Sequence, residues 1–128
     1  MTRKRKVLLV YDSATYRELA TILLEASDCT VTSAGTAAEG MRLAEDGPDL
    51  ILVDFNLPDI NGFHAARLLR DNPRTRGIPL LGLTADDVSD VDHQAARDAG
   101  FDAFITKPIA REEFRAALAP LLATQEDP

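Results

Sequence analysis

Cysteine is nearly absent from this sequence, and long apolar runs are absent altogether. Cys29 alone cannot form an internal disulfide, and no cysteine or histidine spacing indicates a zinc site. Val7 to Val10 is too short for the apolar segment of a signal peptide, and no other run approaches a membrane span. We therefore expect a cytoplasmic protein without membrane contact, in which Cys29 is a small buried apolar residue.

An excess of basic residues is also lacking. The 128 residues carry a formal net charge of −7, which argues against a general nucleic-acid-binding protein because such proteins present a basic field. The cluster Arg3-Lys4-Arg5-Lys6 is the local exception, and we interpret it as a solvated flank of the first strand. Repeats and long linkers are missing, so we expect one domain over residues 1–128, with a core from about 6 to 123 and a polar tail over 124–128.

The sequence does contain four short apolar runs, each of which leads into a polar residue. Runs that are apolar throughout are typical of strands buried on both faces, as in a parallel sheet covered by helices. In such a sheet the ligand site lies beyond the carboxyl ends of the strands, so the four polar ends should meet at one edge. The runs are Val7-Leu8-Leu9-Val10 before Tyr11-Asp12, Leu50-Ile51-Leu52-Val53 before Asp54, Leu80-Leu81-Gly82-Leu83 before Thr84, and Ala103-Phe104-Ile105-Thr106 before Lys107-Pro108.

Helical patterns alternate with the strands, which predicts βα units from end to end. A further strand is expected over Thr30–Ala34, and Thr36-Ala37-Ala38-Glu39 is a capping box that opens the helix after it. Three of the other expected helices are marked by an apolar face. The first follows Ser13, with Leu19, Ile22, Leu23 and Ala26 on that face, the second has Phe63, Ala66 and Leu69, and the last has Phe114, Ala117, Leu118 and Leu121. A further helix is expected from about Ser89 to the residue before Gly100.

Two of the polar strand ends are carboxylates that should face each other across a crevice. Unpaired like charges at that range are costly and are usually relieved by a cation or a raised pKa. Asp12 and Asp54 suit Mg²⁺, which uses one or two carboxylates, several waters and phosphate oxygens. Lys107 adds a positive charge and Thr84 adds a hydroxyl, and both are suited to bind a phosphoryl group. An aspartate can act as the nucleophile that accepts such a group. Alternatively, each aspartate merely caps the next helix or loop, which suits Asp12 beside Ser13 but explains both poorly.

The strand ends also carry short motifs that are weak individually but specific as an ordered set. They are Val10-Tyr11-Asp12, Leu52-Val53-Asp54-Phe55-Asn56-Leu57-Pro58, Asn61-Gly62, Leu83-Thr84-Ala85 and Thr106-Lys107-Pro108-Ile109. From Lys6 to Ala123 the chain resembles a receiver domain of two-component response regulators, close in pattern to the single-domain chemotaxis regulator. We predict an α/β, flavodoxin-like, doubly wound fold, with a five-stranded parallel sheet of order 2-1-3-4-5 and helices on both faces.

The resemblance implies roles for individual residues. Asp54 would be the phosphoacceptor and Asp12 a direct Mg²⁺ ligand, with the backbone carbonyl of Asn56 as a further ligand. Thr84 would bond the phosphoryl group in the active state, and Lys107 would pair with it.

Two more features of strand 103–106 and its end follow from the resemblance. Phe104 matches the aromatic switch position, whose ring turns inward when Thr84 is drawn to the phosphate; alternatively it is an ordinary core aromatic. The Lys107–Pro108 bond is expected to be cis, which would aim the ammonium back over the site.

The sequence departs from the family pattern at two positions. Tyr11 replaces the first member of an acidic pair that normally holds the metal through water, and Asn61 replaces an aspartate before Gly62. The second change is mild because asparagine also serves as a turn or cap residue. The first removes a negative charge, and loss of such a partner typically costs on the order of 10–100-fold in metal affinity. Asp59 or Asp86 is a candidate to compensate.

We expect a signalling module rather than an enzyme. It would take phosphate from a histidine kinase or phosphotransfer protein and bind an unknown downstream protein through the face of helix 89–99, strand 103–106 and the helix around 114–121. Tyr11 keeps open a phosphorylation-independent interaction module that uses the same face. A haloacid-dehalogenase-like phosphatase is disfavoured because Asn56 stands where that family has a second acid. A flavodoxin-like electron carrier is disfavoured because Ser13-Ala14-Thr15 is not convincingly phosphate-binding.

Overall fold

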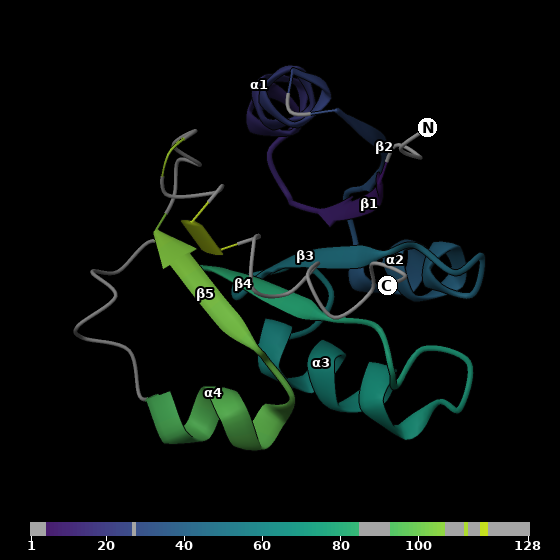
Figure 1. Ribbon diagram of the computed structural model, residues 1–128. Helices are drawn as coiled ribbons and strands as arrows, with labels where there is room; N and C mark the ends of the chain where they lie inside the picture. The colour runs from purple at the N-terminus through teal and green to yellow at the C-terminus, as the bar shows by residue number, and fades with distance from the viewer. Residues whose placement is uncertain (1–4, 27, 85–92, 107–111, 113–115, 118–128) are drawn as a thin grey trace.

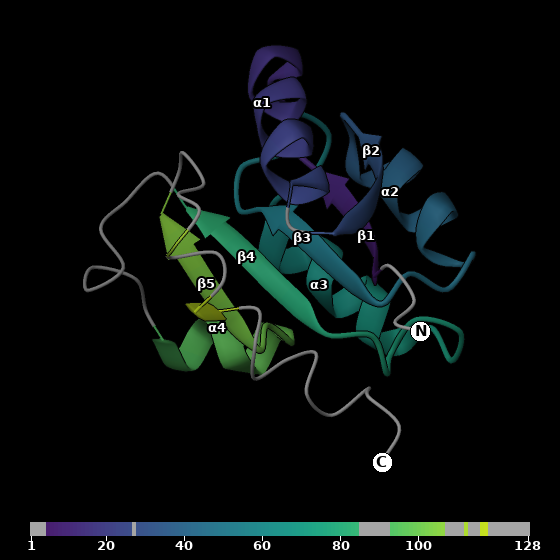
Figure 2. The same cartoon turned by 45° about the horizontal axis from the view of Figure 1, so that its top comes forward.

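A computed structural model describes residues 5–26, 28–84, 93–106, 112 and 116–117. Its centre is a five-stranded sheet in the order β2-β1-β3-β4-β5, in which every neighbouring pair is parallel (Figure 2). The predicted fold class and strand order are therefore confirmed. The strands are β1 (Arg5–Val10), β2 (Cys29–Ala34), β3 (Leu50–Asp54), β4 (Leu80–Thr84) and β5 (Ala103–Thr106).

Helices cover both faces of this sheet, which is why β3 and β4 are apolar up to their last residues, Asp54 and Thr84. Every residue of β3 and β4 is buried. Figure 1 shows α1 (Ala14–Glu25) on one side of the sheet and α3 (Gly62–Asp71) and α4 (His93–Ala99) on the other. Side chains of α2 (Ala37–Ala44) belong to the same core cluster as those of α3 and α4. The expected start of the fourth helix and the Lys107–Pro108 bond lie outside the described residues. Of the last expected apolar face, only Ala117 is described, and it packs against the core cluster that contains Leu9.

The apolar face predicted for α1 is wrong. Leu19 and Ile22 are 55% and 61% exposed, whereas Ala20 and Leu24 are the buried residues of the helix. Ala20 and Leu24 are four residues apart and therefore share one face, which packs in the core cluster containing Leu9 of β1. The sheet thus contacts a stripe one residue away from the predicted one, and its small alanine lets the helix lie close to the strands.

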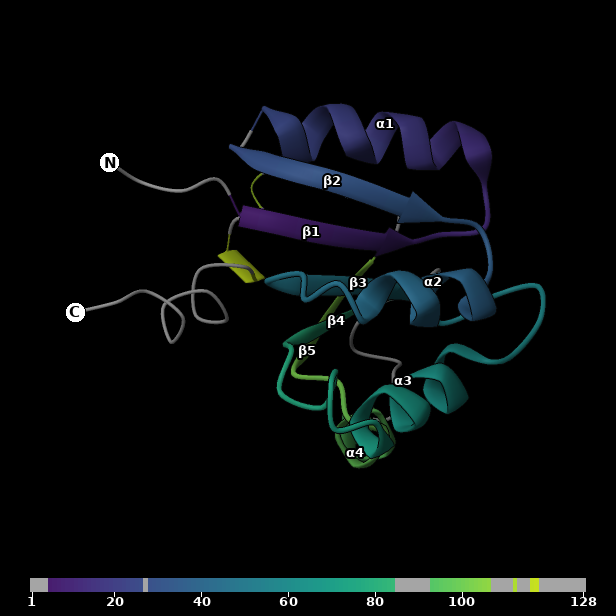
Figure 3. The ribbon, with the colours of Figure 1, turned by 90° about the vertical axis from the view of Figure 1, so that its right-hand side faces the viewer.

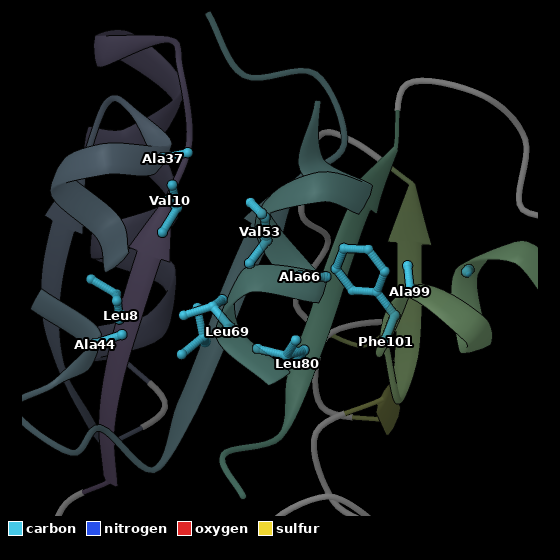
Figure 4. Close-up of a cluster of buried hydrophobic side chains, with 13 residues drawn as sticks. Leu8, Val10, Ala37, Ala44, Val53, Ala66, Leu69, Leu80, Ala99 and Phe101 are labelled. Carbon is cyan, nitrogen blue, oxygen red and sulfur yellow. The ribbon is translucent and has the colours of Figure 1, made fainter. Parts of the chain in front are cut away.

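The core on the opposite face follows the predicted pattern. Ala66 and Leu69 of α3 are buried beside Val53 and Leu80 of the sheet, and Phe63 packs against the same cluster (Figure 4). Cys29 is also buried, as predicted, although it begins β2 rather than lying before it.

Polar side chains in the connections after the strands cap the helices that follow. Ser13, Thr36 and Asn61 each accept a hydrogen bond from a backbone N–H in the first turn of α1, α2 and α3 respectively. Each helix after β1, β2 and β3 therefore begins at the same edge of the sheet, as Figure 3 shows for α1 and α2. None of the helices within the described ranges is long and apolar enough to cross a membrane.

Candidate functional site

The sheet register brings the predicted site residues to one edge, the end to which all five strands point. Val10 of β1 is paired with Val53 of β3, so Asp54 lies one residue beyond this pair and Asp12 two residues beyond it. Asp54 is paired with Leu83 of β4, which places Thr84 next to it. Three of the predicted residues, Asp12, Asp54 and Thr84, are therefore gathered at the carboxyl edge. Lys107 follows β5 but lies outside the described residues.

Asp54 sits in a tight turn at the end of β3. Its carboxylate accepts a hydrogen bond from the backbone N–H of Asn56 at 2.9 Å, and the N–H of Gly62 donates to the carbonyl of Phe55 at 2.8 Å. A side chain at Gly62 would collide with the carbonyl oxygen of Asp54 and with the backbone of Phe55. Glycine is thus required at the start of α3, because the loop folds back directly onto the acceptor strand.

Arg17 of α1 holds the backbone of the segment that carries Asp12. Its Nη1 donates to the carbonyls of Tyr11 and Asp12 at 2.8 and 3.0 Å. The same nitrogen lies only 2.8 Å from where a Cβ on Gly35 would stand, so glycine leaves the room it needs. We did not predict this residue from the sequence, although a basic side chain one turn into the helix after Asp12 is the signal that would have indicated it.

Tyr11 occupies the position of the missing acid and is buried, with 4% of its surface exposed. It shares a core cluster with Leu50 and Leu52, which alternate with Asp54 along β3, so Tyr11 and Asp54 face the same side of the sheet. Its ring stacks on that of Tyr16 with centroids 6.0 Å apart. Burial, followed by the negative charges of Asp54 and Tyr16, raises the pKa of Tyr11 to about 12. The residue is therefore a neutral phenol at physiological pH.

Asp59 does not compensate for the missing acid. Its two carboxylate oxygens accept hydrogen bonds from the backbone N–H groups of Ala37 and Ala38, at the start of α2. These bonds, the Ala37 one most strongly, lower the pKa of Asp59 against a smaller opposing effect of burial. Both carboxylate oxygens of Asp59 are thus bound to the start of α2, and the hypothesis that Asp59 substitutes for an acid at position 11 is not supported. Asp86, the other candidate, lies outside the described residues.

Phe104 of β5 belongs to a group of aromatic rings that begins beside the acceptor. Phe55, the residue after Asp54, lies 6.1 Å from Phe104 between ring centroids, and His93 at the start of α4 meets Phe104 edge-on at 4.9 Å. Phe104 is half-buried rather than enclosed. These ring contacts place Phe104 between Phe55 and α4.

The donors at the carboxyl edge fit a magnesium ion. Within the described ranges, no three histidine, cysteine or acidic side chains come together as a complete protein cage for a metal. Mg²⁺ does not need such a cage, because it keeps several waters and typically takes one or two carboxylates. The buried Asp54 carboxylate, the exposed Asp12 carboxylate and the backbone carbonyl of Asn56 are the oxygen donors that would hold it.

Comparison with protein-family models decides which family has this arrangement. The model of the response regulator receiver domain matches residues 7–119. The chain belongs to the response regulator receiver domain family. This receiver domain is 33% identical over 111 residues to the polar-differentiation response regulator DivK of Brucella ovis, an alignment covering 86% of this chain and 89% of DivK. It is thus a receiver domain of two-component signalling.

Solved structures similar to this receiver domain include a chemotaxis protein and part of a sensor histidine kinase. Chemotaxis protein CheY4 of Vibrio cholerae matches with a TM-score of 0.84 and 26% identity, over 92% of this chain and 98% of CheY4. The receiver domain of the sensor histidine kinase PA1611 of Pseudomonas aeruginosa matches with a TM-score of 0.83 and 28% identity, over 93% of this chain and 98% of that one. The PA1611 structure is described with a magnesium ion coordinated in its active site cleft.

Proposed function

We propose that this receiver domain accepts a phosphoryl group on Asp54, with Mg²⁺ as cofactor. The observation that supports the proposal is the sheet register, in which Asp54 ends β3 and Asp12 follows the end of the neighbouring strand β1 at the same edge. The donor would be a histidine kinase or a histidine phosphotransfer protein. We propose further that residues 1–128 work as a single domain in the cytoplasm.

The reaction proposed for Asp54 is a substitution at phosphorus. A carboxylate oxygen of Asp54 attacks the phosphorus, the bond to the donor's imidazole nitrogen breaks, and its electron pair leaves with the imidazole, which takes up a proton. The metal, when bound, neutralises the charge on the phosphoryl oxygens. Asp12, Asp54 and the Asn56 carbonyl would hold it. Lys107 would supply a further positive charge, and the Thr84 hydroxyl a hydrogen bond.

The proposed output is a change in the face built from α4, β5 and the residues after β5. Thr84 ends β4 and is paired with Thr106 at the end of β5, so a pull on Thr84 acts beside Phe104. The contact between Phe104 and His93 would carry a change in ring position to α4. A downstream protein that binds this face would then distinguish the two states.

A second candidate function is a protein-interaction module that is never phosphorylated. The observation in its favour is that Tyr11 is buried next to an acceptor of which only 1% is exposed. Tyr11 supplies no negative charge to the metal, and its ring fills space at the carboxyl edge. We favour phosphorylation because Asp12 and Asp54 both remain, and Mg²⁺ typically takes only one or two carboxylates.

Incubation with acetyl phosphate over a series of Mg²⁺ concentrations, followed by a phosphate-affinity gel, tests the proposal. The wild-type chain should take up phosphate, Asp54→Asn should take up none, and Tyr11→Asp should need less Mg²⁺ for half-maximal uptake. The expected difference is about 10–100-fold, the usual effect of a residue that holds a metal through water. If only Tyr11→Asp takes up phosphate, the interaction module replaces the active receiver.

A further inference from the structure

The loop of residues 55–61, which joins β3 to α3, carries the Asn56 carbonyl and is held firmly at its base. Besides the bonds at Asp54 and Gly62, Asn56 and Asn61 form an isolated antiparallel bridge across the loop. The hydrogen bonds use the N–H of Asn56 and the carbonyl of Phe55, so the direction of the Asn56 carbonyl also depends on the residues that follow it. They do not reach the tip of the loop, where Asp59 lies.

The tip is tied to a different part of the chain. Oδ1 and Oδ2 of Asp59 accept hydrogen bonds of 2.9 and 3.0 Å from the N–H groups of Ala37 and Ala38, which precede Asp59 by 22 and 21 residues. Both donors are in the first turn of α2, where backbone N–H groups have no partner inside the helix and favour a negative charge. Figure 3 shows the start of α2 and the loop at the same end of the molecule.

The anchor itself is rigid because α2 lies very close to β1. A Cβ on Gly40 would stand 2.7 Å from a methyl group of Val10, so the helix backbone rests directly on the strand that leads to Asp12. Asp59 therefore joins the loop after the acceptor to a helix packed on the strand of the other acid.

The capping of α2 is shared between two separate segments of the chain. The helix has its own N-cap residue, because the hydroxyl of Thr36 accepts a hydrogen bond from the N–H of Glu39 at 3.2 Å. Asp59 contacts two other N–H groups and comes from another segment. Its distinctive effect is on the position of the loop.

We infer that Asp59 is a positioning residue for the metal site, because its clamp on α2 holds the Asn56 carbonyl at the carboxyl edge. This inference rests on the proposed function, in which that carbonyl is a metal ligand. Loss of the clamp leaves Asp12 and Asp54 in place but lets the third oxygen move, so metal binding weakens without being abolished.

Binding of Mg²⁺ to four purified full-length chains tests the inference, with no phosphorylation involved. The chain has two tyrosines and no tryptophan, and the stacked rings of Tyr11 and Tyr16 beside the site supply the fluorescence signal. Asp59→Ala should raise the Mg²⁺ concentration at half-saturation roughly 10-fold, the low end for residues that orient a metal ligand. Asp59→Asn keeps one accepting oxygen and should fall between the wild type and Asp59→Ala.

Thr36→Ala is the matched control, because it removes the cap of α2 but leaves Asp59 and its donors unchanged. It should lower the urea midpoint of unfolding and leave Mg²⁺ binding at the wild-type level. Hydrogen exchange of a peptide covering the loop should become faster in Asp59→Ala and stay unchanged in Thr36→Ala.

The outcomes separate the inference from the proposed function. If the wild type binds Mg²⁺ and Asp59→Ala binds it equally well, or Thr36→Ala weakens binding as much, Asp59 only stabilises α2 and the inference is overturned. If the wild type binds no Mg²⁺ and takes up no phosphate, the proposed function itself fails, and a positioning role toward the metal fails with it.

Discussion

Replacement of Arg70 by alanine should destabilise this fold more than the loss of any ordinary surface arginine. Arg70 extends from α3 and donates to the carbonyl of Gly100 from Nε and Nη2, at 3.0 and 2.7 Å. Its Nη1 donates to the carbonyls of Arg76 and Ile78 at 2.6 and 2.7 Å, and Nη2 pairs with Asp102 at 2.9 Å. One guanidinium thus joins α3, the loop before β4 and the turn before β5.

The expected cost follows from the groups that lose a partner. A buried polar group left without its hydrogen bond costs about 1–3 kcal/mol. The Arg70 side chain is 25% exposed, so water can reach part of the network and lowers this figure. The ion pair with Asp102, whose side chain is 43% exposed, adds about 0–1 kcal/mol. For three carbonyls and one ion pair we expect a loss of about 2–4 kcal/mol in the free energy of unfolding.

Urea unfolding followed by far-ultraviolet circular dichroism measures this loss, with Arg74→Ala as the matched control. Arg74 is 75% exposed in its side chain and pairs with Glu45 at 3.3 Å, so its removal should cost less than about 1 kcal/mol. Arg70→Lys keeps the charge but lacks the planar fork, and should lose most of what Arg70→Ala loses. Equal unfolding free energies for Arg70→Ala and Arg74→Ala would refute the reasoning.

Three further predictions concern the carboxyl edge and the sheet. Folding raises the pKa of Tyr11 from 10.0 to about 12, so the contribution of this shift to the free energy of unfolding is present below pH 10 and is lost between about pH 10 and 12. Ultraviolet titration should show one tyrosine that ionises near pH 12, and Tyr11→Phe should remove that transition. Gly62→Ala should weaken Mg²⁺ binding measured by tyrosine fluorescence, because its methyl group displaces the Asp54 carbonyl, and unchanged binding would contradict the tight turn. Gly82→Ala drives a methyl group into the Phe55 ring and should cost about 1–3 kcal/mol in urea unfolding, whereas Gly77→Ala, with open space around it, should cost less than about 0.5 kcal/mol.

The residue order was sufficient to predict the sheet and the edge that carries the site. The runs 7–10, 50–53 and 80–83 within β1, β3 and β4 contain no polar side chain, which is typical of strands buried on both faces. In a parallel sheet all carboxyl ends lie on one side, so the polar residues after the runs had to meet there. The prediction used local composition and one geometric rule, and it required no knowledge of side-chain packing.

The packed face of α1 depended on the tertiary structure. Leu19, Ile22 and Leu23 form a plausible apolar stripe, yet the sheet contacts Ala20 and Leu24 instead. Helical spacing defines which residues share a face, but the choice between adjacent faces depends on how closely the helix can approach the strands.

The roles of Tyr11 and Asp59 were also decided only by the tertiary structure. The sequence determined that an acid is missing at position 11, but burial of the phenol beside Asp54 follows from the register of β1 against β3. Asp59 finds its partners in a helix that begins 22 residues earlier, and those partners are backbone N–H groups that any residue would provide. No side-chain pattern signals such a contact, because it arises only when the chain has folded and the first turn of α2 meets the loop.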